Sequence, residues 1–312
     1  MPEKVLVTGG AGFIGSTTAD LLIENGFEVC IVDNLFMGKK ENIPKKAVFY
    51  KADVREKKAL QKIFEKEKPQ YAMHFAAHMN LRQSITDPFF NADVNITGSL
   101  NLLECCREAK TKKIIFASSG GAAYGDPFEL PVPESHALQP LSPYGASKIA
   151  VEQYLFSYWK NFGLDFTAMR YANVYGPRQN PESEAGVISI FARAMLENRE
   201  PLIFGNGEQT RDFVFSGDVA RANLLALKKD TKRKIFNIGT SEEHSVNEIF
   251  SYLKKFFGFE KGAVKKPAIS GEVKRISLDN SNAKKELSWA PETSFAKGLE
   301  ITAEWFKKEA EK

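Results

Sequence analysis

The stretch Val5-Leu6-Val7-Thr8-Gly9-Gly10-Ala11-Gly12-Phe13-Ile14-Gly15 decides how the chain folds. Its apolar start predicts a buried strand, and residues 16–25 predict a helix that closes at Gly26. Between them, three glycines recur at the spacing Gly-x-x-Gly-x-x-Gly. Glycine allows a tight turn, a close approach of an anion to the backbone, and close packing of helix on strand. Because the first N–H groups of the helix face that anion, the stretch predicts a phosphate-binding turn.

Short apolar runs alternate with longer amphipathic segments through the first half of the chain. Runs that predict strands lie at 27–33, 47–52, 71–76 and 113–117, and patterns that predict helices lie at 57–67 and 96–109. Continuous apolar strands separated by helices are typical of a parallel sheet covered on both faces. We therefore predict an α/β fold, with a Rossmann doubly wound parallel sheet in residues 1–175. A smaller α/β substrate lobe is expected in residues 176–312, with some of its segments returning to the first lobe.

Composition excludes several classes of protein. Of 312 residues, 43% are hydrophobic and 26% charged, which excludes a disordered chain or a disulfide scaffold. The 43 basic and 39 acidic residues are interspersed and leave a charge of only +4, so we expect no nucleic-acid partner. The longest run without a charged residue, 5–19, is too short to cross a bilayer. Only three cysteines, two of them adjacent, and the absence of a signal-like start favour a cytoplasmic protein with reduced thiols. We expect no metal.

Two carboxylates follow predicted strands. Asp33 ends the second strand, eighteen residues beyond Gly15, where a carboxylate accepts hydrogen bonds from a ribose diol and repels a 2′-phosphate. This position favours NAD over NADP, the alternative being an aspartate that merely ends a strand. Asp53 ends the third strand and is a candidate contact for adenine. With the glycine turn, these residues predict NAD as the cofactor.

A tyrosine and a lysine share one predicted helix face in Ser142-Pro143-Tyr144-Gly145-Ala146-Ser147-Lys148. Ser142 suits the N-cap and Pro143 the first helical position, which places Tyr144 in the first turn and Lys148 four residues on. An ordinary tyrosine has a pKa of roughly 10 and is a poor base at neutral pH. An ammonium group and a helix N-terminus both stabilise phenolate, so we predict a lowered pKa for Tyr144 and a role as base.

Ser118 and Ser119 follow the strand predicted at 113–117, at the sheet edge that carries the chemistry in parallel α/β folds. A hydroxyl there can hold a substrate oxygen beside Tyr144, although serines in glycine-rich turns also serve as structural residues. The loop that follows is long and carries prolines at positions 127, 131, 133, 140 and 143. Its length and proline content predict a shaped wall of the site.

Together these motifs resemble the extended short-chain dehydrogenase/reductase superfamily and, within it, the nucleotide-sugar epimerases of the UDP-glucose (UDP-galactose) 4-epimerase type. The resemblance spans nearly the whole chain and includes His74-Phe75-Ala76-Ala77, residues 170–178 and residues 205–218. It implies a tightly held NAD and a UDP-sugar substrate. The implied reaction interconverts UDP-galactose and UDP-glucose through a 4-keto intermediate, by reversible hydride transfer. It also implies a homodimer, for which the apolar faces of 96–109 and 149–159 are candidates.

The resemblance also assigns residues. It implies Tyr144, Lys148 and Ser119 as the catalytic residues, with Asn95 supporting the tyrosine–lysine geometry. It implies cofactor contacts from Gly9, Gly12, Phe13, Ile14, Gly15, Asp33, Asn34, Gly38, Asp53, Val54, Phe75, Ala76, Ala77, Asn95, Ser118, Tyr144, Lys148 and Tyr171. It implies substrate contacts from His78, Ser119, Tyr144, Asn173, Val187, Arg211 and Arg275, with Asn173 and Arg211 on the diphosphate.

Some positions depart from the family pattern. Gly120 stands where family members commonly place the catalytic hydroxyl, whereas Ser119 keeps the expected twenty-five-residue separation from Tyr144. Ile269 stands where a second diphosphate arginine is usual, which leaves Arg275 or Arg82 as replacements. Ile276 occupies a position that often helps set sugar size, so an N-acetylhexosamine substrate stays open.

Two other functions fit the sequence less well. A nucleotide-sugar dehydratase needs an Asp-Glu pair after the strand-five hydroxyl, and Gly120-Gly121 stand there instead. A silent NAD-binding sensor has no need of both Tyr144 and Lys148.

Overall fold

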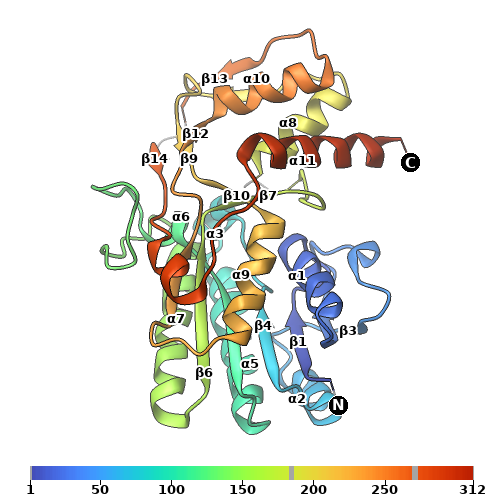
Figure 1. Ribbon diagram of the computed structural model, residues 1–312, viewed down its shortest axis with the longest axis vertical. Helices are drawn as coiled ribbons and strands as arrows, with labels where there is room; N and C mark the ends of the chain where they lie inside the picture. The colour runs from blue at the N-terminus through green and yellow to red at the C-terminus, as the bar shows by residue number, and fades with distance from the viewer. Residues whose placement is uncertain (1, 183–185, 269–272, 312) are drawn as a thin grey trace.

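A seven-stranded parallel sheet forms the centre of the larger lobe (Figure 1). The computed structural model describes residues 2–182, 186–268 and 273–311. The strand order is β11-β6-β5-β4-β1-β2-β3, and every neighbouring pair is parallel. The strands are β1 (Lys4–Thr8), β2 (Glu28–Asp33), β3 (Val48–Lys51), β4 (Tyr71–His74), β5 (Lys113–Ser119), β6 (Asp165–Tyr171) and β11 (Ile235–Ile238). The predicted doubly wound α/β fold is confirmed.

Helices cover both faces of this sheet, because successive side chains along each strand point to opposite faces and both sets are apolar. In β1, Val5 and Val7 belong to one buried cluster, with residues of α1 (Phe13–Glu24) and α9 (Ser216–Lys228). Leu6 belongs to a second cluster on the opposite face. That cluster is completed by α2 (Lys57–Glu67), α5 (Gly98–Glu108) and α7 (Pro143–Phe162). Strands buried on both faces therefore read as continuous apolar runs in the sequence.

Shorter elements surround the carboxyl edge of the sheet. They are η1 (Lys40–Asn42), α3 (Leu81–Thr86), α4 (Pro88–Ala92), the π-helical η2 (Asp93–Thr97) and α6 (Gly120–Ala123). The helix predicted at 96–109 is thus preceded by a π-helical turn at η2, which runs directly into α5. Helix α7 begins as predicted, because the Ser142 hydroxyl accepts the Gly145 N–H at 3.2 Å and Pro143 opens the helix.

The smaller lobe has its own buried cluster, which includes Phe191, Ile249, Leu253 and Leu299. Its helices are α8 (Val187–Leu196), α10 (Val246–Phe257) and α11 (Phe295–Ala310). Its strands are β7 (Asn173–Tyr175) beside β10 (Phe213–Phe215), β9 (Thr210–Arg211) between β12 (His244–Ser245) and β14 (Arg275–Ile276), and β8 (Leu202–Phe204) beside β13 (Val264–Lys266). Figure 1 shows α8, α10 and α11 beyond the carboxyl edge of the sheet.

Two segments from the second half of the chain complete the first lobe: α9 packs beside α1, and β11 is an edge strand of the sheet. The π-helical η3 (Ala283–Leu287) lies next to them, with Ala283 and Leu287 in the same buried cluster as α9. Within the described ranges, no helix is long and apolar enough to cross a membrane.

Candidate active site

The glycine turn between β1 and α1 has no room for side chains. A Cβ on Gly15 would lie 2.2 Å from the Gly9 carbonyl oxygen, and one on Gly9 would lie 2.6 Å from the Ala76 nitrogen. Gly9 also has a φ of +70°, which disfavours any L side chain. Helix α1 starts at Phe13 with no side-chain cap and no acidic residue in its first turn. Its first N–H groups therefore suit an anionic diphosphate, and the cradle fits a dinucleotide such as NAD.

Asp33 is fixed at the end of β2 by backbone groups. Its Oδ2 accepts the Ala11 N–H at 3.0 Å and its Oδ1 accepts the Leu35 N–H at 2.8 Å. Burial raises the pKa of Asp33, while these two hydrogen bonds act in the opposite direction. Gly38 lies against the same carboxylate, since a Cβ there would be 2.9 Å from Asp33 Oδ1. The predicted ribose-binding carboxylate is thus preorganised beside the glycine turn.

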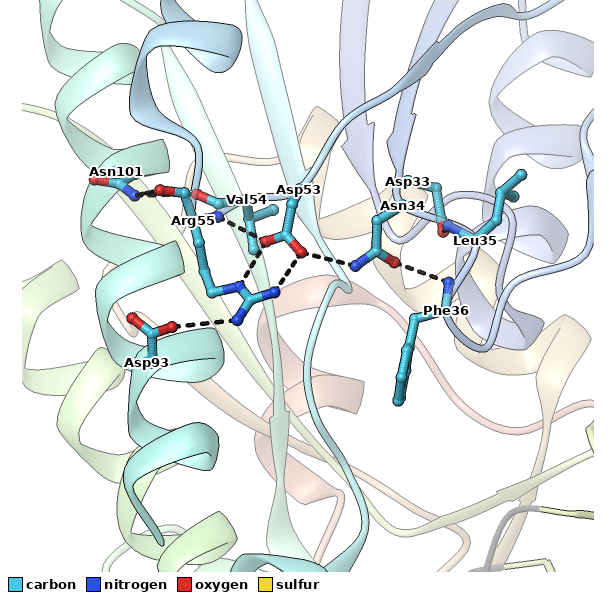
Figure 2. A network of polar contacts seen from close by, with 9 residues as sticks. All are labelled: Asp33, Asn34, Leu35, Phe36, Asp53, Val54, Arg55, Asp93 and Asn101. Atoms are coloured by element: carbon cyan, nitrogen blue, oxygen red, sulfur yellow. Dashed lines mark hydrogen bonds and ion pairs between the residues drawn. The ribbon is translucent and has the colours of Figure 1, made fainter. Parts of the chain in front are cut away.

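A polar network extends this region toward β3 and η2, and Figure 2 shows its members. Asn34 Nδ2 donates to Asp53 Oδ2 at 2.9 Å. The Arg55 guanidinium pairs with Asp53 at 2.9 Å and with Asp93 at 3.3 Å. Arg55 is the main reason that the pKa of Asp53 falls to about 2. The sequence reasoning identified Asn34 and Asp53 but missed Arg55, although its place two residues after Asp53 is a usable signal.

A neutral histidine lies under the carboxyl end of β4. His74 Nδ1 lies 2.6 Å from the Thr8 hydroxyl and Nε2 lies 2.8 Å from the Ser99 hydroxyl. The Ser99 hydroxyl in turn donates to the Asn95 carbonyl. Burial lowers the pKa of His74 to about 3, so the ring is uncharged at neutral pH. These hydrogen bonds join β1, the strand before the glycine turn, to η2. No sequence pattern points to Thr8 or Ser99 as members of such a network.

Asn95, on η2, supports the start of α7 as expected. Its Nδ2 donates to the Ser147 hydroxyl at 2.9 Å, and that hydroxyl donates to the Tyr144 carbonyl at 2.7 Å. Asn95 Oδ1 also accepts the His78 N–H at 2.7 Å. The His78 ring nitrogens are engaged by Gln83 at 3.0 Å and Asn91 at 3.2 Å. This geometry makes His78 part of the scaffold beside the site and does not favour the substrate contact expected of its ring.

The three candidate catalytic side chains meet at the carboxyl end of β5. Ser119 is the last residue of the strand, and its hydroxyl lies near enough to the Tyr144 phenol to lower the pKa of that group. Lys148 Nζ donates to the Ala117 carbonyl at 2.8 Å and lies 5.7 Å from the centroid of the Tyr144 ring. The side chains of Tyr144 and Ser119 are partly buried, and Lys148 is buried. A base, a cation and a hydroxyl are thus gathered in one place.

The pKa values differ from the sequence prediction. Burial raises the pKa of Tyr144 to about 12, and the nearby Ser119 hydroxyl only partly offsets it. Burial likewise lowers the pKa of Lys148 to about 7, against the favourable charge of Glu152. The predicted lowering of the Tyr144 pKa is therefore wrong for this structure. Desolvation of both groups outweighs the helix terminus and the neighbouring ammonium.

Some predicted cofactor residues offer only part of their surface to the edge. The Ser118 hydroxyl donates to Glu152 at 2.6 Å, and the Tyr171 hydroxyl donates to Asn223 at 2.7 Å, both in buried positions. The cofactor contacts predicted for Ser118 and Tyr171 therefore stay predictions. Their hydroxyl groups are already engaged, so such contacts would have to use other atoms of these residues. The other predicted positions lie where the turn and the β3 and β4 ends converge. Phe13 and Ile14 open α1, Val54 follows Asp53, and Phe75, Ala76 and Ala77 follow β4.

Residues of the second lobe lie beside this edge. Asn173 starts β7, and its Oδ1 is 3.9 Å from the Cβ that Gly121 would carry, just after Ser119. Val187 begins α8 and packs against that lobe's buried cluster. Arg211 lies in β9, between β12 and β14, and its Nη1 donates to the Thr210 carbonyl at 2.8 Å.

The replacements for a second diphosphate arginine differ in placement. The Arg275 side chain is 64% exposed and pairs with Glu243 at 2.5 Å, so its charge is already compensated. The Arg82 guanidinium, from α3, lies 6.0 Å from the ring centroid of Phe204 in the second lobe. The geometry therefore favours Arg82 over Arg275 for reaching between the lobes. Ile269, which marks the family position, lies outside the described residues.

Comparison with known proteins now defines the class. Residues 5–239 match the NAD dependent epimerase/dehydratase family, and the chain belongs to that family. A UDP-glucose 4-epimerase of Mycolicibacterium smegmatis is 38% identical over 99% of this chain and 100% of its own. The UDP-glucose 4-epimerase of Thermotoga maritima, solved with UDP-glucose, is 46% identical, with a TM-score of 0.96 over 98% of this chain and 99% of that one. The Thermus thermophilus UDP-glucose 4-epimerase, solved with NAD, is 39% identical, with a TM-score of 0.93 over 97% and 99%.

Proposed function

We propose that this protein is an NAD-dependent UDP-glucose 4-epimerase that interconverts UDP-galactose and UDP-glucose. The observation that carries the proposal is the meeting of Ser119, Tyr144 and Lys148 at the end of β5. This strand neighbours β4, which separates it from β1 and the glycine cradle. The similarity of the whole chain to three UDP-glucose 4-epimerases supports the same activity.

The chain's own residues hold the cofactor and the substrate in this proposal. The N-terminus of α1 holds the cofactor diphosphate, Asp33 the adenosine ribose, and Asn34 with Asp53 the adenine end. When bound there, NAD would supply a hydride acceptor and donor for C4 of the sugar. Asn173 and Arg211 hold the nucleotide-sugar diphosphate, so that the sugar lies at Ser119.

Tyr144 moves the proton. Its phenolate oxygen accepts the proton of the sugar 4-hydroxyl as the C4 oxygen becomes a ketone, and gives it back when the opposite epimer forms. The Ser119 hydroxyl donates a hydrogen bond to the same sugar oxygen. The phenolate requires a nearby positive charge, because burial alone raises the pKa of Tyr144 to about 12. Lys148 supplies that charge in its ammonium form.

We also propose a cytoplasmic homodimer. Cys30, Cys105 and Cys106 are all buried as free thiols, which suits a reducing compartment. The outward side of α7 carries Phe156 and Phe162, which are 50% and 56% exposed. A second copy of the chain that covers these rings, together with the outer side of α5, would remove them from water.

One relative of solved structure is named for an N-acetylated sugar. A UDP-N-acetylglucosamine 4-epimerase of Methanobrevibacter ruminantium is 35% identical, with a TM-score of 0.92 over 99% of this chain and 100% of that one. Ile276 is buried in one cluster with Val132 and Leu278, at the position to which the family resemblance assigns an effect on sugar size. A panel of UDP-hexoses and UDP-N-acetylhexosamines therefore belongs in the assay.

The test is conversion of UDP-galactose by purified protein without added NAD. We expect UDP-glucose to form, and Tyr144→Phe to lower turnover by about 10²- to 10⁴-fold, because general acid–base catalysis contributes on that scale. Tyr154→Phe is the matched control, since this tyrosine lies on the same helix and is 41% exposed. No conversion of any UDP-sugar, or equal turnover of Tyr144→Phe and Tyr154→Phe, would reject the proposal.

A further inference from the structure

A third residue shares the face of α7 that carries Tyr144 and Lys148. Glu152 lies one turn beyond Lys148, so the three follow one another at intervals of four residues. Glu152 is 1% exposed and lies in the cluster of buried charges beneath the catalytic edge. No part of the proposed reaction uses it directly.

Three consecutive residues of β5 contact this face in turn. The Ala117 carbonyl accepts a hydrogen bond from Lys148 Nζ at 2.8 Å, and the Ser118 hydroxyl donates to Glu152 at 2.6 Å. The Ser119 hydroxyl lies near enough to Tyr144 to lower the pKa of its phenol. Glu152 is thus built into the same strand–helix contact that positions the candidate base and cation.

Glu152 is also half of a buried ion pair. Arg170 donates from Nε to Oε1 at 3.0 Å and from Nη2 to Oε2 at 2.6 Å. Arg170 stands directly opposite Ser118 in the β5–β6 register, so Glu152 bridges two neighbouring strands. Arg170 Nη1 donates further to the Tyr124 hydroxyl at 2.9 Å. The carboxylate is therefore held in one place and cannot turn away from Lys148.

The charges in this cluster do not balance. Arg170 pairs with Glu152 at 2.6 Å, and the charge of Glu152 also raises the pKa of Lys148, which burial lowers to about 7. Two buried cations without that anion would repel each other, and Lys148 would release its proton, whereas a guanidinium does not. The anion is thus required for Lys148 to stay an ammonium ion.

We propose that Glu152 is a positioning residue that keeps Lys148 charged and thereby allows Tyr144 to act as a phenolate. This inference rests on the proposed function, in which Tyr144 moves the proton. Arg170 fixes the carboxylate, and Ser118 joins it to the strand that carries Ser119.

Other titratable groups around Lys148 do not take this role. Among the described residues that face it, His74 on β4 is kept neutral by burial, and Arg170 on β6 carries the wrong sign. On η2, Asp93 is half-exposed and paired with Arg55. Tyr144, on α7 itself, is the group that Lys148 serves. Glu152, four residues from Lys148 on α7, is the anion whose charge raises the pKa of Lys148.

Glu152→Gln tests the charge at nearly constant shape. We expect the alkaline limb of kcat to move to lower pH by about one unit, since an opposite charge nearby shifts a pKa on that scale. We also expect the Tyr144 phenolate to appear at higher pH. That titration is read from the ultraviolet difference between each protein and its Tyr144→Phe counterpart, without substrate. The substrate-free titration separates failure of this inference from failure of the proposed function.

Two further variants separate charge from structure. Arg170→Gln breaks the same buried ion pair as Glu152→Gln and lowers stability, but it keeps the Glu152 carboxylate. The alkaline limb of its kcat–pH profile should therefore stay in place or move to higher pH. Glu152→Asp keeps the negative charge, so the alkaline limb of its kcat–pH profile should lie at the same pH as in the unchanged protein. A folded Glu152→Gln with an unchanged limb and unchanged phenolate titration would overturn the inference. If Glu152→Gln does not fold, a downward shift of the limb in Arg170→Gln or Glu152→Asp would overturn it instead.

Discussion

Replacing Gly15 by alanine tests the cofactor cradle at its tightest point. A Cβ on Gly15 would lie 2.2 Å from the Gly9 carbonyl oxygen, 2.9 Å from the Gly9 carbonyl carbon and 3.0 Å from the Gly10 Cα. All three are backbone atoms of the turn, so relief requires the turn itself to open. Overpacking of this kind costs about 1–3 kcal/mol. If the opened turn loses that much interaction with the cofactor, NAD affinity falls by roughly 5- to 150-fold.

The assay for Gly15→Ala is NAD binding to cofactor-stripped protein by titration calorimetry, with a denaturant melt of the stripped protein in parallel. Gly262→Ala is the matched control, because nothing lies within 4 Å of the Cβ it would add. We expect the control to bind like the unchanged protein. If Gly15→Ala binds NAD as tightly as Gly262→Ala and is as stable, the turn does not form the cradle described here.

Further predictions concern the catalytic edge and its charges. Ser119→Ala should lower kcat by ~10²-fold, the scale of losing one hydrogen-bond donor to a developing charge; an unchanged kcat in steady-state assays would move that role elsewhere. Arg211→Met should raise KM for the UDP-sugar by roughly 10- to 100-fold, the scale of a hydrogen bond to a charged group, with a smaller effect on kcat; equal KM values would remove Arg211 from the diphosphate site. The pKa of Lys148 is about 7 in the folded protein, below its ordinary value, so between those values the unfolded chain binds the extra proton. Stability should therefore rise with pH, by about 2 kcal/mol from about pH 7 to about pH 9 relative to Lys148→Met in urea melts; parallel curves for the two proteins would contradict the lowered pKa of the buried lysine.

The sheet and its edge were predictable because local sequence carries them. Val5-Leu6-Val7 and the glycines after it specify a strand and a turn without help from distant residues. Ser142 and Pro143 likewise start α7 at the predicted position, which places Tyr144 and Lys148 together on one face.

Other features of the fold and the site depend on contacts between distant residues, which no local sequence pattern encodes. The return of β11 to the sheet is set by its parallel pairing with β6, more than sixty residues earlier. The pKa of Tyr144 depends on how completely α7 is buried against β5, and the sequence shows only the helix end and the lysine. Arg170 reads as an ordinary strand residue until the fold places it against Glu152.

The central claim is that hydride leaves and returns at the same sugar carbon without exchange with water. UDP-galactose deuterated at C4 tests it, with the product UDP-glucose analysed by mass spectrometry and no NAD added. The account predicts that the deuterium is retained at C4 of UDP-glucose. Loss of the deuterium to solvent, or conversion only when NAD is supplied in each turnover, would contradict it.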